Sequence, residues 1–170
     1  MIDGILNGVP TWVWFLFVFL LILGLIDTRA RKSPLHVFYL LPLLGAMSLR
    51  AVNALDVVFA VWGVVLLVYV FGAWVGFRVQ KKWIVAKSRM FVSLKGEWLT
   101  MVQIMSIFAI NFATGMLKAV SPEVLTSTTY HIIFAAIAAM VAGLFGGRTL
   151  SVAIAPTTEQ DEVHRVAYGL

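Results

Sequence analysis

Residues 57–77 have the sequence VVFAVWGVVLLVYVFGAWVGF and carry no charged side chain. The hydrocarbon core of a bilayer is about 30 Å thick, and a helix of roughly 20 apolar residues crosses it. This segment therefore predicts a transmembrane helix. A basic stretch, residues 78–95, follows it directly, so we expect its carboxyl end on the cytoplasmic side of the membrane.

Four further apolar segments lie around this one, each between charged residues. Of the 170 residues, 61% are hydrophobic and 12% are charged, whereas about 25% of a soluble domain is charged. We therefore predict an all-α membrane protein with five transmembrane helices. The start of the chain has neither a basic segment nor a small-residue cleavage site, so the first helix is expected to stay as an anchor. The predicted spans are residues 10–27, 34–50, 56–78, 97–118 and 128–148, and the tail is 149–170.

The basic residues predict the orientation of the chain. Eleven of the 13 Lys and Arg residues lie in the first loop, the third loop and the tail or at the helix ends that adjoin them, and only Arg50 and Lys118 lie on the other side. Cytoplasmic loops carry the excess of Lys and Arg in membrane proteins. The amino terminus is therefore expected outside and the carboxyl terminus in the cytoplasm.

The third loop, residues 79–96, predicts a cytoplasmic β-hairpin. Its segments 79–85 and 90–94 are rich in Val, Ile, Trp and Phe, with a polar break between them. A two-stranded hairpin is marginally stable alone, so it should pack on the helix ends or recruit a third strand, for which residues 151–155 are one candidate. Its positive charges could bind anionic lipid or a partner protein, or could serve only to orient the chain. They are Arg78, Lys81, Lys82, Lys87, Arg89 and Lys95.

The fourth predicted helix carries a polar stripe along one face. At about 100° per residue its polar side chains fall within a narrow arc, in which Ile107 is the apolar member. The stripe could form a polar pathway or cleft, or could make hydrogen bonds between helices. Its members are Thr100, Gln103, Asn111, Thr114 and Lys118.

Small residues recur on the fifth predicted helix at Ala135, Ala139, Gly143 and Gly147. Such ridges let helix backbones approach closely. We expect the third, fourth and fifth helices to form the tightly packed core, with the first helix facing lipid.

Four residues could form an outer vestibule: Arg50, Asp56, Tyr130 and His131. His36 is predicted at the opposite end of the membrane from His131, so the two cannot ligate one haem. The chain has no cysteine, which excludes thiolate metal sites and disulfides. The pattern predicts no catalytic, metal or cofactor site.

Three short motifs resemble a family of small, uncharacterised bacterial integral membrane proteins that share a domain of unknown function. They are PTWVW at 10–14, KGEW at 95–98 and IFAINFATG at 107–115. The resemblance implies a multi-pass protein of the bacterial inner membrane. It implies no established activity.

Three functions fit these patterns. The first is a non-enzymatic inner-membrane accessory or assembly protein that binds lipid or partners through its small-residue helix faces and its basic loop. The second is a small oligomeric transporter or channel with the polar stripe along its path. The third is a redox or cofactor-binding subunit. The patterns favour the first, with anionic headgroups, a second copy or another membrane protein as partners and no nucleic acid.

Overall fold

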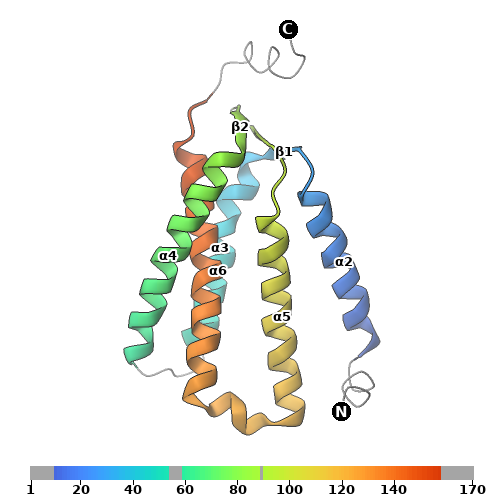
Figure 1. Cartoon of the computed structure of the whole chain (residues 1–170), viewed down its shortest axis with the longest axis vertical. Helices are drawn as coiled ribbons and strands as arrows, with labels where there is room; N and C mark the ends of the chain where they lie inside the picture. The colour runs from blue at the N-terminus through green and yellow to red at the C-terminus, as the bar shows by residue number, and fades with distance from the viewer. Residues whose placement is uncertain (1–9, 54–58, 89, 158–170) are drawn as a thin grey trace.

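The structure is a computed structural model that describes residues 10–53, 59–88 and 90–157. In this part of the chain five long helices lie side by side, with a small sheet at one end and a short 3-10 helix, η1, at the other (Figure 1). The helices are α2 (Thr11–Asp27), α3 (Leu35–Asn53), α4 (Phe59–Trp83), α5 (Leu99–Val120) and α6 (Thr128–Ile154), and η1 is Pro122–Thr126.

Four of these helices are long and apolar enough to cross a membrane: α3, α4, α5 and α6. α2 is apolar as well but shorter, with 17 residues. The coarse prediction of a multi-pass helical protein is therefore compatible with the helices that are described. α6 begins at Thr128, where the side chain of Ser127 accepts a hydrogen bond from the Tyr130 backbone at 3.2 Å. Such a cap satisfies one of the free N–H groups of a helix start.

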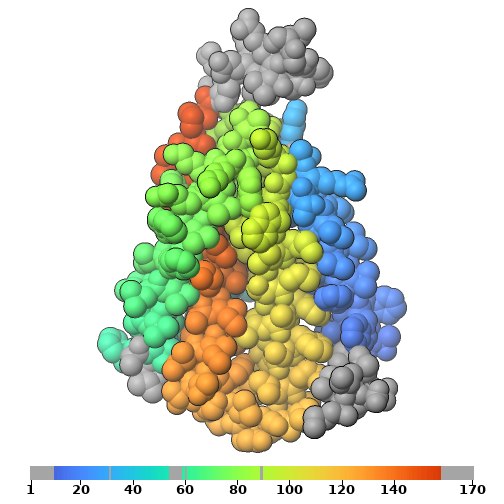
Figure 2. Space-filling view, in the orientation of Figure 1, coloured from blue at the N-terminus to red at the C-terminus, as the bar shows by residue number. Residues whose placement is uncertain are grey.

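The core of the bundle is formed by α6, α4 and α3. α6 packs most extensively on α4 and next on α3, whereas α2 packs chiefly on α5. Figure 2 shows α6 between α4 and α5, with α2 beside α5 at the edge. The predicted close contact between the third and fifth helices is confirmed. The predicted place of α5 in that core is wrong, because α3 occupies it and α5 meets α6 over a smaller surface.

Glycines bring the α4 and α6 backbones together. A Cβ atom at Gly72 would lie 2.7 Å from the carbonyl oxygen of Met140, and one at Gly76 would lie 2.5 Å from that of Leu144. Gly143 and Gly147 face α4 in the same way. Only hydrogen fits in these positions, so the small-residue ridge of α6 is the surface on which α4 rests.

The sheet has three antiparallel strands in the order β1-β3-β2. β1 is Arg31–Pro34, β2 is Ile84–Lys87 and β3 is Phe91–Leu94, which pairs with both. The third strand therefore comes from the segment before α3. The prediction that residues 151–155 could form this strand is wrong, because residues 151–154 are the last turn of α6 and Ala155 is its C-cap. Residues 79–83, predicted as strand, are the end of α4.

The sheet packs on the ends of the helices. Val92 and Leu94 of β3 are buried against Phe38 of α3 and Val152 of α6. α6 also runs beyond the predicted boundary at 148 and ends at Ile154. Residues 149–154 contain no charge, so the apolar cluster under the sheet can take them as a further helical stretch.

Candidate functional site

Arg148 is buried inside the bundle, near the end that carries the sheet. Its side chain is 3% exposed, although the sequence places it at the edge of the membrane. A buried guanidinium needs a counter-charge and hydrogen-bond acceptors, because transfer of an unpaired charge out of water is very costly. The site is therefore defined by the groups that surround this side chain.

Three acceptors from three segments surround Arg148. Its Nε donates to Oε1 of Gln80 at 2.9 Å, and its Nη1 donates to Oε1 of Gln103 at 2.6 Å. Its Nη2 forms an ion pair with Oε1 of Glu97, which also accepts a hydrogen bond from the Thr100 hydroxyl at 2.7 Å. We call Gln80, Glu97, Gln103 and Arg148 the Arg148 cluster. All four are buried, and they join α4, the start of α5 and α6.

Glu97 is held in place by the backbone around it. Its N–H donates to the carbonyl oxygen of Asp27 at 3.0 Å, at the end of α2. The preceding residue, Gly96, has a φ of 96°, which L side chains rarely adopt. A Cβ at Gly96 would also overlap the carbonyl group of Thr28. Gly96 therefore lets the chain pass close to the end of α2 and direct Glu97 at Arg148.

The cluster retains hydrogen-bonding capacity. Within the described residues, Nε2 of Gln80, Nε2 of Gln103, Oε2 of Glu97 and Oγ of Ser151 have no hydrogen-bond partner. Buried polar atoms of this kind usually bind ordered water or a ligand. The cluster offers donors and acceptors and one ion pair. It presents no nucleophile beside a base.

A groove runs next to the cluster between α3, α5 and α6. Its volume is about 340 Å³, and apolar side chains form most of its wall. The polar side chains along it are Ser48 and Asn111, whose donors are bonded within their own helices to Leu44 and Ile107. The groove and the cluster adjoin on α6, where Phe145 lines the groove and Arg148 lies one turn further.

The predicted polar stripe of α5 is divided among three surroundings. Gln103 belongs to the Arg148 cluster and Thr100 donates to its Glu97, Asn111 lines the groove, and Lys118 is exposed. The Thr114 hydroxyl lies 2.8 Å from the Tyr130 hydroxyl, and it donates to the Ile110 carbonyl at 2.7 Å.

The residues of the predicted outer vestibule are partly separated. Tyr130 is adjacent to His131, with ring centroids 6.2 Å apart, and both lie at the start of α6. Arg50 is exposed near the end of α3, and Asp56 lies outside the described residues. His36 is at the sheet end of α3, far along the bundle from His131. Among the described residues no group of three or more His, Cys, Asp or Glu could hold a metal ion.

The basic loop is less uniform than predicted. Lys87 is buried, and its ammonium donates to the carbonyl oxygens of Val152, Ala153 and Ala155 at 2.8–3.0 Å. It therefore closes the end of α6 and does not contribute to a lipid-binding surface. The Arg78 guanidinium lies 5.0 Å from the centre of the Trp74 ring. Lys81, Lys82 and Lys95 are exposed, and Arg89 lies outside the described residues.

Sequence reasoning missed three of the four cluster members: Gln80, Glu97 and Arg148. Two signals in the sequence could have identified Glu97 and Arg148. Glu97 is the one acidic residue between Asp56 and Glu123, at the entrance of a helix. Arg148 is followed by the apolar segment TLSVAIA, which is unusual for a charge that ends a transmembrane helix. A charge flanked by apolar sequence on both sides is expected to be paired inside the protein.

No protein-family model, no curated protein and no solved structure matches this chain. The described part of the chain is a helical bundle with a buried Arg–Glu pair, and four of its helices are compatible with a multi-pass membrane protein.

Proposed function

We propose that this chain is a non-enzymatic lipid-binding protein of the bacterial inner membrane. The observation that carries the proposal is the groove between α3, α5 and α6, which lies along helices long and apolar enough to be surrounded by lipid. Its walls offer dispersion contacts and almost no polar group. Such a wall suits an acyl chain better than an ion or a polar solute.

The dimensions of the groove support this assignment. Its α6 wall extends from Phe134 to Phe145, which at 1.5 Å per residue is about 16 Å. Half of a hydrocarbon core is about 15 Å, the depth reached by the tail of a lipid in one leaflet. An acyl chain entering from one leaflet would therefore extend along the groove toward the Arg148 cluster.

A transporter that conducts along α5 is the second candidate. It is favoured by the unpaired atoms of Gln80, Glu97 and Gln103 at one end of the stripe. Against it, the middle of the stripe borders a wall formed by Ile107 and Ile110.

Ala51→Trp is expected to lower lipid retention severalfold. Ala51 is an exposed residue on the α3 wall of the groove, so an indole can enter the groove without displacing the core. The measurement is native mass spectrometry of protein taken from nanodiscs, counting the lipids that stay bound. Ala113→Trp is the matched control, since Ala113 is exposed on α5 and does not line the groove. Equal retention in Ala51→Trp, Ala113→Trp and the parent protein would refute the lipid groove.

We also propose that all five helices span the membrane, with the amino terminus outside. α2 has 17 residues, or about 26 Å, so a small local thinning of the bilayer would let it span. The sheet end, with the exposed Lys81, Lys82 and Lys95, would then be cytoplasmic. A cytoplasm-active reporter fused after Leu170 should be active and one inserted at Asn53 silent. The reverse pattern would refute the orientation.

A further inference from the structure

We propose that the groove binds a phospholipid with its phosphate at Lys118 and its tail directed toward the Arg148 cluster. This inference rests on the proposed lipid-binding function and specifies the ligand and its direction. It starts from a regular order of side chains along α5, from the groove outward to the end of the helix.

Asn111, Thr114 and Lys118 lie on one face of α5 at successive turns. Asn111 lines the groove, and Lys118 lies in the last turn of the helix. Seven residues separate them, which is about 10 Å along the axis. Side chains of a helix tilt toward its amino terminus. The four-carbon stem of Lys118 can therefore reach back toward the mouth of the groove.

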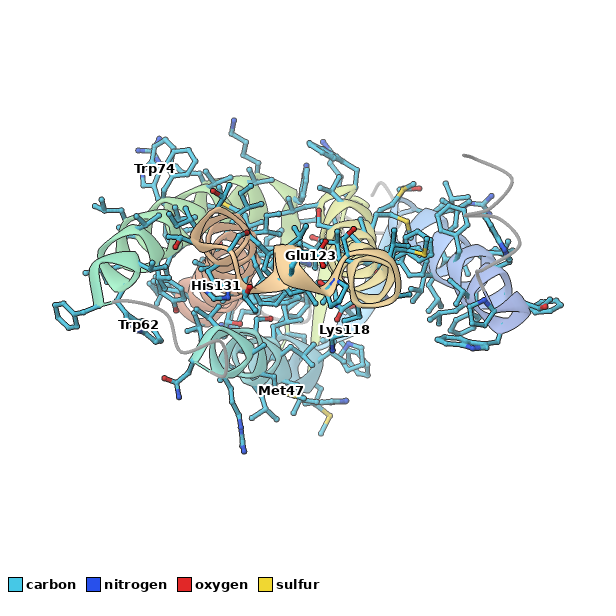
Figure 3. All side chains as sticks on the ribbon, turned by 90° about the horizontal axis from the view of Figure 1, so that it is seen from below. Met47, Trp62, Trp74, Lys118, Glu123 and His131 are labelled. Atoms are coloured by element: carbon cyan, nitrogen blue, oxygen red, sulfur yellow. The ribbon has the colours of Figure 1, made fainter. Side chains whose placement is uncertain are left out.

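The view along the bundle supports this direction. Figure 3 shows Lys118 on the same side of the bundle as Met47, which lines the groove from α3. Met47 is 64% exposed, so this side of the groove opens outward. Met47 lines the groove from α3, and Lys118 lies on the same side of the bundle in the last turn of α5.

The ammonium of Lys118 is available for a ligand. The side chain is exposed, and no hydrogen bond or ion pair engages it within the part of the chain that the structure describes. The nearest acidic residue in the sequence, Glu123, lies on η1 and is exposed as well. A phosphate would be the counter-ion of Lys118 at the membrane surface, where one basic residue is worth about fivefold in affinity.

From the groove outward along α5, the side chains change in polarity in the same order as a phospholipid does from its tail to its phosphate. Apolar walls come first, for the acyl chain. The Asn111 amide borders the groove, and the paired hydroxyls of Thr114 and Tyr130 lie beyond its lining, nearer the end of α5. The Lys118 ammonium comes last, at the depth of the phosphate. The far end of the groove adjoins the Arg148 cluster. The guanidinium of Arg148 is already paired with Glu97, so it is not the group that binds the lipid phosphate.

The test compares two lipids with identical chains, phosphatidylglycerol and diacylglycerol. Lys118→Gln should lower retention of phosphatidylglycerol about fivefold and leave diacylglycerol unchanged. Lys118→Arg should retain both lipids. Lys82→Gln is the matched control for general attraction of anionic lipid, because Lys82 is exposed at the sheet end. Retention is counted by native mass spectrometry after transfer from nanodiscs of stated composition.

Each result separates the two proposals. Unchanged phosphatidylglycerol binding in Lys118→Gln, or an equal loss of both lipids, would overturn the role of Lys118 while the groove could still hold a tail. If Ala51→Trp retains both lipids but Lys118→Gln loses phosphatidylglycerol, the groove is refuted and the directed binding mode falls with it. Loss of both lipids in Ala51→Trp together with a selective loss in Lys118→Gln supports the inference.

Discussion

Arg148→Met is expected to destabilise the protein by about 3–5 kcal/mol, because it leaves the Glu97 carboxylate buried without its counter-charge. Gln80 and Gln103 would lose their donor at the same time, since both accept from the same guanidinium. The free energy of unfolding would be measured by titration with a denaturing detergent in mixed micelles. Arg78→Met is the control, because Arg78 is exposed on α4 and should change stability little.

A second variant separates loss of the ion pair from loss of packing. Replacing both partners of a buried ion pair by apolar residues is often neutral, whereas removing one partner is costly. Arg148→Met combined with Glu97→Leu should therefore recover most of the stability lost in Arg148→Met alone. If the double variant is as unstable as the sum of two single losses, the Arg148 cluster is not held together by charge.

Gly76→Ala is expected to cost about 1–3 kcal/mol through overpacking of the α4–α6 contact. Its new methyl group would lie 2.5 Å from the carbonyl oxygen of Leu144, so the two helix backbones must move apart. The same unfolding titration measures the effect. Lower stability should be accompanied by weaker protection of α6 amides from hydrogen exchange.

Gly63→Ala is the matched control on the same helix. Apart from its own turn of helix, no atom of the described residues lies within 4 Å of the position that a Cβ would take at Gly63. Alanine is also the better helix former, by about 0.5–1 kcal/mol. Stability should therefore be unchanged or slightly higher. An equal loss in both variants would show that a glycine in α4 matters for some reason other than contact with α6.

The apolar helices could be predicted from the sequence because each depends on the length of one local segment. Residues 57–77 are sufficient to predict a helix regardless of their neighbours. The small-residue ridge of α6 could be predicted for the same reason, because its spacing lies within one segment. Gly143 and Gly147 of this ridge face α4. The division of the helices into an α3–α4–α6 group and an α2–α5 pair could not be predicted. It depends on the choice among several similar apolar surfaces, which no single segment encodes.

The candidate site was predicted only where its residues lie on one helix. The stripe of α5 included Gln103 because a helical face can be found by periodicity. Arg148 was counted among the cytoplasmic charges that orient the chain, because a basic residue at the end of an apolar segment usually serves orientation, and Glu97 was given no role beyond the start of a predicted span. Their pairing joins positions far apart in the sequence. It requires the turn at Gly96 and the sheet, whose third strand was also misassigned.

The pairing of α2 with α5 bears on how the protein is made. α2 precedes the other described helices in the sequence, yet its main contact in the bundle is α5, which follows α3, α4 and all three strands. If α2 spans the membrane as proposed, it must stay in the bilayer during synthesis without its native neighbour, held by its own hydrophobicity. β1 likewise precedes β3, the strand with which it pairs, by two helices and a strand in the sequence. In that case membrane insertion and tertiary assembly are separate events for α2, and slow assembly would leave α2 open to capture by other membrane proteins.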